Sequence, residues 1–309
     1  MPQAVYVFSA PIIEKMKAHY NETLQQTPQG AIFRAKTSNA VITAYKSGKV
    51  VFQGSAPDLE TSKWPEPSEK DSSKSSSTQK TTTYTPPTTL FTSNHIGSDE
   101  AGTGDYFGPI TVACAFVKED QIELLKELGV KDSKNLKDTT IRSISKEIIR
   151  LNIPYSLLIL HNEKYNKLQK KGWSQGKMKA MLHHHAINNL LKKIENKPLE
   201  GILIDQFCEP SLYKKYISTE QESLAKNTFF MTKAESHSIA VAAGSIIART
   251  SFLNEMDKLS AKIGTTLPKG ASKLVDQTIA KVIKKKGQGA LESCAKTHFA
   301  NTKKAQQYL

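Results

Sequence analysis

The sequence predicts a large α/β domain, with helices layered on a sheet, preceded by a small α+β domain. Three observations support this prediction. A chain of 309 residues suits two domains better than one. Residues 65–94 are dominated by small polar side chains and separate two regions that carry apolar periodicity. In the second region, short apolar runs alternate with longer amphipathic runs, which is typical of layered α/β domains.

The first domain, residues 1–64, combines helices with a short meander of strands. Apolar side chains recur near a 3.6-residue period at its start, which indicates a helix. Asn39 and the Ser47-Gly48 pair mark turns between β-like runs. The expected elements are a helix over residues 11–26, strands over 31–35, 41–45 and 50–53, and a second helix over 57–64.

Residues 65–94 have the composition of a flexible linker. Half of them are Ser or Thr, four are Pro, and very few are apolar. Such a segment cannot bury enough surface to offset the entropy lost when it is ordered. We therefore expect this linker to tether the two domains.

The second domain, residues 95–309, carries the α/β pattern. A strand, a glycine-rich turn and another strand are expected over residues 95–117. The run GILID at residues 201–205 is apolar until its final acid, which is typical of a buried central strand. The other expected elements are helices over 121–128, 141–151, 175–194, 238–263, 271–285 and 290–296, and strands over 155–160 and 229–232.

The chain is basic, with 43 Lys and Arg against 29 Asp and Glu and a formal net charge of +14. Both predicted domains share this excess. Residues 1–64 hold seven Lys and Arg against four Asp and Glu, and residues 95–309 hold 33 against 22. Basic surfaces attract phosphates, so nucleic acid is a candidate partner. A solvated basic surface without a partner is the alternative that charge alone leaves open.

The cysteines and the apolar runs indicate the cellular compartment of the protein. Cys114, Cys208 and Cys294 lie far apart and form neither a zinc-binding nor a disulfide pattern. No stretch approaches the roughly 20 apolar residues that span a bilayer, and no signal-peptide pattern is present at the start. We therefore expect a cytoplasmic monomer with no membrane contact and no obligate protein partner.

Four carboxylates stand out by their surroundings. Asp99 and Glu100 are adjacent at the end of an apolar run, directly before a glycine turn. Adjacent strand side chains face opposite ways, so both acids serve one site only if the strand ends or bends there. Asp205 closes its strand at the carboxyl edge, where open α/β sheets place their sites. Glu235 lies just before a predicted helix, where the helix dipole favours negative charge.

Ordinary structural roles compete with a functional one at these positions. A helix-capping acid explains Glu235 equally well, and a turn residue is the alternative for Asp205. The Asp99-Glu100 pair is harder to explain in this way, because two acids at the end of a buried strand repel each other unless a cation lies between them. Oxygen ligands without His or Cys select Mg²⁺ or Mn²⁺ over zinc. Several carboxylates around such ions, on a basic protein, suit two-metal phosphodiester hydrolysis.

Four motifs resemble those of the type 2 ribonucleases H, in the ribonuclease HIII version. They are GSDEAGTGDYFGP at residues 97–109, VKDSKNL at 130–136, KAESHSIAVAAGSIIAR at 233–249 and CAKTHFANTKKA at 294–305. The resemblance therefore spans residues 95–309. Residues 1–64 are similar to the TATA-binding-protein-like domain that precedes the catalytic domain in that family, through their layout and the run VITAYKSGKVVFQG at 41–54.

The resemblance implies a ribonuclease H-like fold, a mixed sheet flanked by helices. It also implies endonucleolytic cleavage of the RNA strand of RNA–DNA hybrids, with two Mg²⁺ or Mn²⁺ ions and 5′-phosphate and 3′-hydroxyl products. Carried over position by position, it makes Asp99, Glu100, Asp205 and Glu235 the catalytic and metal-binding acids. A glutamate as the fourth acid favours ribonuclease HIII over ribonuclease HII.

Substrate recognition is implied for the glycine turn. Gly102, Thr103 and Gly104 are expected to approach the ribose 2′-hydroxyls with their backbone. Thr103 stands where the HII proteins carry arginine, so we expect runs of ribonucleotides to be cut and single ones poorly. A ribonuclease HII-like enzyme that cuts at single ribonucleotides in DNA and a non-catalytic hybrid-binding protein are the alternatives.

Further substrate contacts are expected on both domains, with a solvated basic surface as the alternative. The residues are Lys131, Ser133 and Lys134 near the scissile strand, and Lys36, Lys46 and Lys49 on the sheet surface of the first domain. Asp105 is expected to orient the glycine turn. The histidines at 183–185 are consecutive on a predicted helix and cannot share one face, so we expect no metal there. Gly244 departs from the family pattern, which has alanine at this position.

Overall fold

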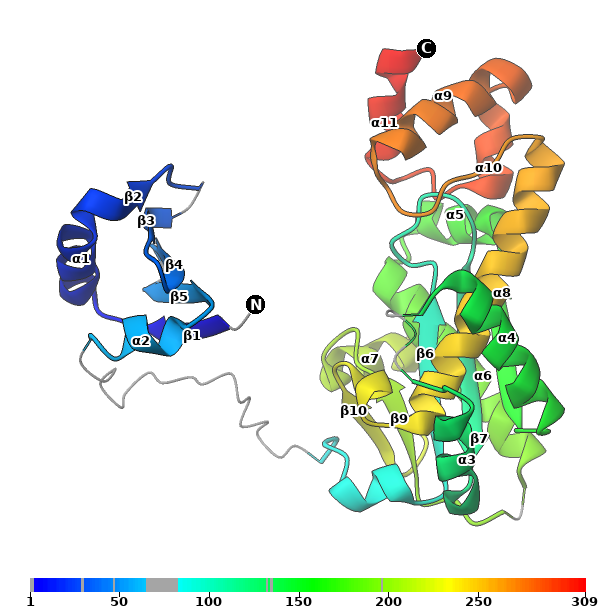
Figure 1. Ribbon diagram of the computed structural model, residues 1–309. Coiled ribbons are helices and arrows are strands. Elements are labelled where there is room, and N and C mark those ends of the chain that lie inside the picture. Colours follow the sequence, from blue (N-terminus) through cyan, green and yellow to red (C-terminus); the bar gives the residue numbers. More distant parts are fainter. Residues whose placement is uncertain are drawn as a thin grey trace. The chain divides into compact units, whose positions relative to one another are not determined.

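The computed structural model describes residues 3–28, 31–46, 48–64, 83–131, 133, 136–195 and 197–309. The chain divides into two compact units, Met1–Thr82 and Thr83–Leu309 (Figure 1). Each unit has its own apolar core, and each is described by itself. Within the described ranges, no helix combines the length and apolar character needed to cross a membrane.

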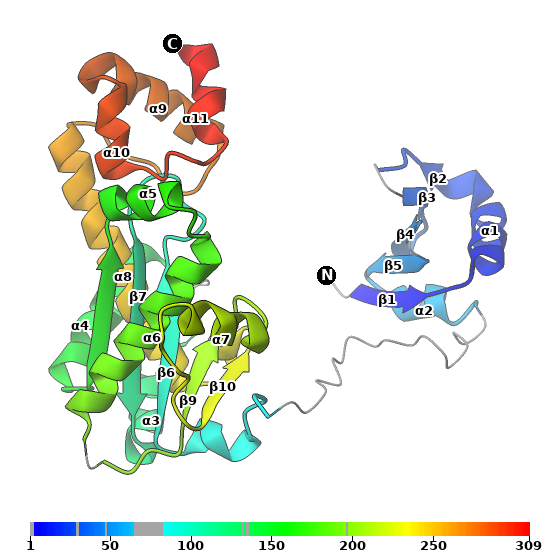
Figure 2. The same cartoon turned by 180° about the vertical axis from the view of Figure 1, so that it is seen from behind.

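The first unit is a five-stranded antiparallel sheet with strand order β1-β5-β4-β3-β2. Its helix α1 covers one face of the sheet (Figures 1 and 2). The elements are β1 (Gln3–Val7), α1 (Ala10–His19), β2 (Leu24–Gln25), β3 (Ala31–Lys36), β4 (Ala40–Tyr45), β5 (Lys49–Gly54) and α2 (Pro57–Thr61).

The two faces of this sheet differ in character. Side chains that alternate along β3, β4 and β5, such as Phe33, Ile42 and Phe52, are buried against Ile13 and Met16 of α1. The intervening side chains project from the other face, because successive residues of a strand point in opposite directions. The predicted helix over residues 11–26 is too long, and β1 was not expected.

Strand pairing explains both differences. Leu24 pairs with Ala35, so the segment after α1 contributes an edge strand and does not continue the helix. The short run β1 pairs along its whole length with β5, and this partner is separated from it by more than forty residues. A local sequence pattern does not show which distant strand β1 pairs with, so β1 could not be predicted from it.

The second unit is built on a mixed five-stranded sheet with order β10-β9-β6-β7-β8 (Figures 1 and 2). Strands β6, β9 and β10 are parallel to one another, whereas β7 is antiparallel to both β6 and β8. The strands are β6 (His95–Ala101), β7 (Ile110–Val117), β8 (Tyr155–Leu160), β9 (Gly201–Asp205) and β10 (Thr228–Met231). This is the mixed sheet expected for the second domain.

Helices cover both faces of that sheet. The long helix α8, with α3 and α4, packs on one face, and α6 and α7 pack on the other (Figures 1 and 2). The C-terminal helices form a separate cluster around the aromatic residues that follow β6. The helices are α3 (Ile122–Glu127), α4 (Asp138–Arg150), α5 (Asn162–Lys170), α6 (Gln175–Lys193), α7 (Pro210–Ser218), α8 (Ile239–Ile263), α9 (Lys273–Lys286), α10 (Leu291–Cys294) and α11 (Asn301–Lys304).

The start of the second unit differs from the predicted linker boundary. Residues 83–94 lie within the predicted linker, yet they pack on the second unit. Leu90 is buried against Leu203 and Val241, and the backbone N–H of Phe230 donates to the carbonyl of Tyr84 at 2.9 Å. These few apolar side chains are enough to bind the end of a Ser/Thr-rich segment to the sheet. The rest of the predicted linker, residues 65–82, lies outside the described residues.

Helix α8 approaches the sheet closely because glycine occupies the contact on both sides. A Cβ added at Gly97 of β6 would lie 2.0 Å from the backbone nitrogen of Val241. A Cβ added at Gly244 of α8 would lie 3.0 Å from the carbonyl oxygen of Ala113 and 3.2 Å from that of Gly97. The departure from alanine at Gly244 therefore lies in helix packing, as expected, and allows a close contact between α8 and the sheet.

Gly97→Ala tests this contact. The added methyl group would meet backbone atoms that cannot rotate away, so we expect the free energy of unfolding to fall by about 2 kcal/mol or more. Gly289→Ala is the matched control, because a Cβ there meets nothing within 4 Å, and its effect should stay within about 0.5 kcal/mol. Urea denaturation of the full chain provides the comparison, and equal midpoints for the two variants would contradict the account.

Candidate active site

Three of the four predicted acids meet at one edge of the second sheet. Asp99 lies near the end of β6, Asp205 is the last residue of β9, and Glu235 lies in a short 3-10 helix after β10. Parallel pairing of Ser98 with Ile204 brings the ends of β6 and β9 side by side. One carboxylate oxygen from each acid lies within 4.8 Å of the others.

Local structure holds Glu235 and Asp205 in place. Lys233 adopts a left-handed backbone conformation, with φ of 57°, and this turns the chain after β10 into the 3-10 helix. The backbone N–H of Ala234 then donates to Asp205 Oδ1 at 2.8 Å. Ser238 caps α8 directly afterwards, because its hydroxyl accepts from the N–H of Val241 at 3.1 Å.

Burial and neighbouring charge make the Asp99 carboxylate unfavourable as an anion. Its side chain is 5% exposed. Burial first, and then the negative charges of Glu100 and Asp205, raise the pKa of Asp99 well above its usual value. Hydrogen bonds from the Ser245 side chain and the backbone of Glu100 oppose this rise in pKa only in part. A bound cation would remove the repulsion, and the oxygen-only donor set fits a hard divalent ion.

Glu100 lies apart from this group. Strand β6 continues to Ala101, so the expected end or bend between the two acids is absent, and Glu100 faces α6. Lys179 Nζ donates to Glu100 Oε1 at 2.7 Å, and His183 Nε2 lies 2.9 Å from Glu100 Oε2. Burial raises the pKa of Glu100, but the hydrogen bonds and charges of His183 and Lys179 outweigh it and bring the pKa to about 2.

Lys179 and His183 are site residues that the sequence did not reveal. They are one helical turn apart on α6, so both reach the same carboxylate. His183 Nδ1 also lies 2.7 Å from the hydroxyl of Ser98. The ring of Phe207, two residues after Asp205, stacks on His183 with centroids 5.3 Å apart and lies 4.0 Å from Lys179 Nζ. The only sequence signal was the i, i+4 spacing of two basic side chains on an apolar helix.

Backbone geometry and a side-chain contact fix the glycine turn after β6. Gly102 has φ of +86°, and a Cβ there would lie 2.3 Å from the carbonyl oxygen of Pro109, so only glycine fits. The Gln175 side chain donates to the carbonyl of Thr103 at 3.1 Å. Gly104 is exposed and has open space around its Cα. The hydroxyl of Thr103 is buried and has no hydrogen-bond partner among the residues that the structure describes.

Two residues outside the turn fix its far side. Asp105 Oδ1 accepts a hydrogen bond from the backbone N–H of Gly270 at 2.6 Å, which agrees with the orienting role expected for Asp105. Lys296 is fully buried and donates to the carbonyl oxygens of Asp105 and Gly108 at 2.8 and 2.6 Å. Burial lowers the pKa of Lys296 to about 7. The turn is therefore attached to the C-terminal helices at both ends of the DYFG run.

The residues expected near the scissile strand occupy different environments. Lys131 is exposed, whereas Ser133 is buried and its hydroxyl lies 2.8 Å from that of Ser245. Because Ser245 in turn bonds to Asp99, Ser133 supports the acidic site from behind. Lys134 lies outside the described residues.

The expected basic side chains of the first unit lie on or beside the open face of its sheet. Register places Lys36 opposite Val41, and Arg34 opposite Thr43, on the face that α1 does not cover. Lys49 begins β5 and is exposed, and Lys46 is exposed in the turn after β4.

Comparison with known proteins identifies the family. Residues 96–302 match the family described as Ribonuclease HII, and residues 3–77 match a domain of unknown function, DUF3378. Ribonuclease HIII of Oceanobacillus iheyensis is 62% identical over 309 residues and is matched along 100% of both chains. Ribonuclease HIII of Bacillus subtilis is 50% identical over 308 residues, which cover 99% of this chain and 98% of that protein.

The crystal structure of Bst-RNase HIII in complex with Mn²⁺ superimposes with a TM-score of 0.69 at 40% identity, covering 99% of this chain and 98% of that one. This match confirms the ribonuclease H-like fold of the second unit. Identity along the entire length, together with the family match across the second unit, shows that the chain belongs to the ribonuclease HIII family.

Proposed function

We propose that this ribonuclease H cuts the RNA strand of RNA–DNA hybrids at the acidic edge formed by Asp99, Asp205 and Glu235. The observation that carries the proposal is the meeting of three carboxylates, of which Asp99 and Glu235 are buried, beside an open glycine turn. Cleavage is endonucleolytic and leaves 5′-phosphate and 3′-hydroxyl ends. Family membership supports the same substrate class.

Divalent-metal dependence follows from the family, and two Mg²⁺ or Mn²⁺ ions are the proposed complement. When bound, such ions supply an activated water and charge stabilisation of the leaving oxygen. Asp99, Asp205 and Glu235 would hold these ions, because one carboxylate oxygen of each lies within 4.8 Å of the others. Glu235 would alternatively position the attacking water. Glu100 is the fourth acid, kept ionised by Lys179 and His183.

The glycine turn is proposed to recognise the RNA strand. Backbone at Gly102 and Gly104 comes within reach of ribose 2′-hydroxyls, the groups that distinguish RNA from DNA. Lys131 and Lys134 are proposed to contact phosphates. Runs of ribonucleotides are the proposed substrate, with single ribonucleotides in DNA cut poorly.

The first unit is proposed to bind the hybrid as a TATA-binding-protein-like domain. Its open sheet face carries Arg34, Lys36 and Lys49, and Lys46 lies in the adjoining turn. Covalent connection to the catalytic unit would raise the effective concentration of substrate there. The proposal also places the protein in the cytoplasm as a monomer, where its three free cysteines stay reduced.

Asp99→Asn tests the acidic site. The amide keeps the shape of the side chain but removes a negative charge that would hold the metal ions, so we expect kcat on an end-labelled RNA–DNA hybrid to fall about 1,000-fold or more. Hybrid binding, measured by anisotropy, should remain close to that of the wild type. A variant that turned over substrate at the wild-type rate would remove Asp99 from the mechanism.

The substrate assignment has its own assay with the wild-type protein. A uniform hybrid and a DNA duplex with one ribonucleotide are compared in Mg²⁺ and in EDTA. Metal-dependent cutting of the hybrid alone is expected. Efficient cutting of the second duplex would favour the ribonuclease HII-like alternative, and cutting of neither would favour a binding protein.

Lys36→Ala combined with Lys49→Ala tests the open face of the first unit. We expect KM for the hybrid to rise while kcat changes little, because these side chains are proposed to bind the hybrid and take no part in the chemical step. The slope of log affinity against log salt should fall by about 1 for each lysine that contacts a phosphate. The double variant of Lys15 and Lys17, exposed on α1, is the control of equal charge change. Equal effects of the two pairs would exclude this face as the binding surface.

A further inference from the structure

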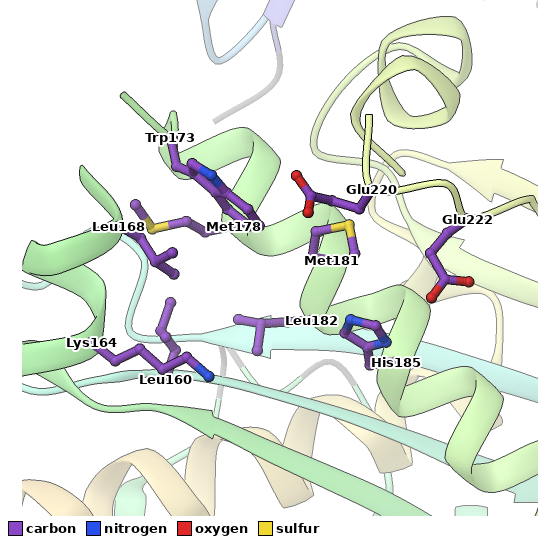
Figure 3. Close-up of a pocket in the computed structure, with 10 residues that line it drawn as sticks. All are labelled: Leu160, Lys164, Leu168, Trp173, Met178, Met181, Leu182, His185, Glu220 and Glu222. Carbon is purple, nitrogen blue, oxygen red and sulfur yellow. The ribbon is translucent and has the colours of Figure 1, made fainter. Parts of the chain in front are cut away.

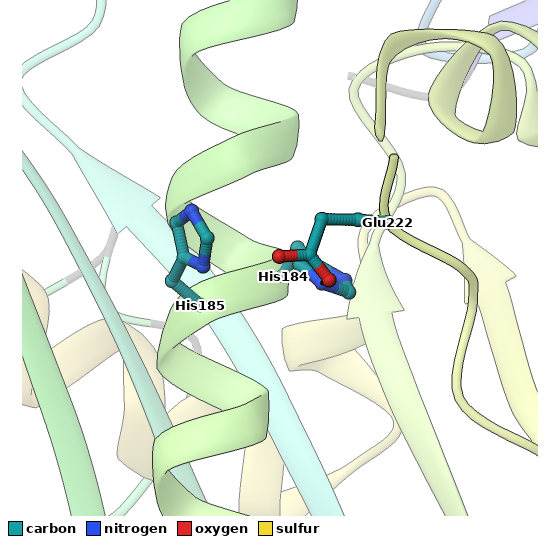
Figure 4. A group of neighbouring side chains, drawn as sticks. All are labelled: His184, His185 and Glu222. Atoms are coloured by element: carbon teal, nitrogen blue, oxygen red, sulfur yellow. Dashed lines mark hydrogen bonds and ion pairs between the residues drawn. The ribbon is translucent and has the colours of Figure 1, made fainter. Parts of the chain in front are cut away.

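A second group of metal-binding side chains lies on α6, away from the acidic edge. His184, His185 and Glu222 each offer one ligand atom, and these atoms lie within 4.8 Å of one another. Figure 4 shows the Glu222 carboxylate reaching toward α6 from the segment between α7 and β10, with the ring of His184 behind it and that of His185 to one side. Two consecutive helical residues do not share one face, but here the third ligand comes from another segment and reaches both.

Two of the three ligands, His184 and Glu222, are already in contact. His184 Nε2 lies 3.0 Å from Glu222 Oε2, and the side-chain amide of Asn188 lies 2.9 Å from the same nitrogen. His184 is buried, whereas His185 is exposed and free to turn toward the pair.

The site opens on a groove in the protein surface. Figure 3 shows His185 and Glu222 on the wall of a cavity of about 340 Å³, together with Glu220 and apolar side chains of α6. Glu220 is held by Lys177 Nζ at 2.6 Å. His185 and Glu222 line this groove, and the buried His184 lies directly behind Glu222. A metal held by the three side chains would keep the groove side open to water.

We propose that His184, His185 and Glu222 bind one Zn²⁺ ion. Two imidazoles and one carboxylate are a ligand set of four-coordinate zinc sites that keep an open position, whereas the oxygen-only acids of the active site suit Mg²⁺ or Mn²⁺. On binding, the proton of His184 Nε2 leaves to solvent and the ion takes its place between that nitrogen and Glu222. The ion then ties α6 to the segment before β10.

This zinc site joins two elements that serve the active site. Helix α6 carries His183 and Lys179, which hold Glu100, and β10 leads into the turn that carries Glu235. Because the metal binds the folded arrangement and not the unfolded chain, Zn²⁺ should raise the thermal midpoint of unfolding. The acids of the active site are not ligands of this ion, so cleavage in Mg²⁺ does not depend on it.

The test uses the full chain without a polyhistidine tag, stripped with a chelator and then held in a large excess of Mg²⁺ to fill the acidic site. Zn²⁺ is titrated in competition with a chromophoric zinc chelator. The wild type should bind one equivalent of Zn²⁺. His185→Ala and Glu222→Gln should each weaken Zn²⁺ binding about 100-fold or more, because removing even a residue that supports a metal ligand costs up to about this much affinity. Co²⁺ in place of Zn²⁺ should give the intense visible absorption of four-coordinate cobalt with nitrogen ligands.

Three controls separate this site from others in the chain. His161→Ala removes an exposed histidine whose Nδ1 lies 3.6 Å from Glu255 Oε2, with no third ligand among the described residues, and it should leave zinc binding unchanged. Asp99→Asn should leave it unchanged as well. Cleavage of a hybrid in Mg²⁺ should persist in the His185 and Glu222 variants, which shows that they fold. The proposal would be overturned if the wild type bound no Zn²⁺ in competition with the chelator, or if His185→Ala bound one equivalent as tightly as the wild type.

Discussion

The repulsion among buried carboxylates at the edge of the second sheet is the constraint on which the rest of this structure depends. Asp99 lies beside Asp205 and Glu235, and its burial, followed by the charges of Glu100 and Asp205, raises its pKa. Such a group costs folding free energy unless a cation is present. Natural proteins keep arrangements of this kind where function needs them, at a cost in stability.

The surrounding architecture offsets that cost. Parallel pairing of β6 and β9 fixes two of the acids in register, and the close contact of α8 through Gly97 and Gly244 fixes the sheet against the helix that follows Glu235. Helix α6 neutralises Glu100 from the opposite face with Lys179 and His183. The C-terminal helices hold the glycine turn through Lys296. Each layer of the fold therefore positions one component of the site.

Sequence patterns predicted those site residues whose position depends on neighbouring residues in the chain. Asp205 was predicted because a wholly apolar run that ends in an acid delivers its carboxylate to a strand edge. The resemblance supplied Glu235, for which local features supported a helix cap equally well. Glu100 was expected to share one site with Asp99 through a bend in the strand. Strand β6 runs on to Ala101 and Glu100 contacts α6, so its role as the fourth acid stays a prediction.

The features that were missed all depend on contacts between distant segments. Lys179 and His183 acquire a role only when α6 packs across β6, some eighty residues earlier in the chain. The histidines at 184 and 185 were discounted from helix geometry alone, because Glu222 comes from a loop whose position the sequence does not reveal. Helices α5 and α7 were also not predicted. Each has only nine residues, and helices this short depend on packing for their stability.

The most direct test of the account is the thermal stability of the wild type and of Asp99→Asn, each measured without divalent metal and with Mn²⁺. Replacing Asp99 by an amide removes its repulsion with the neighbouring carboxylates. The metal-free variant should therefore melt at a higher temperature than the metal-free wild type. Added Mn²⁺ should raise the midpoint of the wild type much more than that of the variant. If the variant melted lower than the wild type without metal, and gained as much from Mn²⁺, clustered negative charge would not be the constraint that shapes this site.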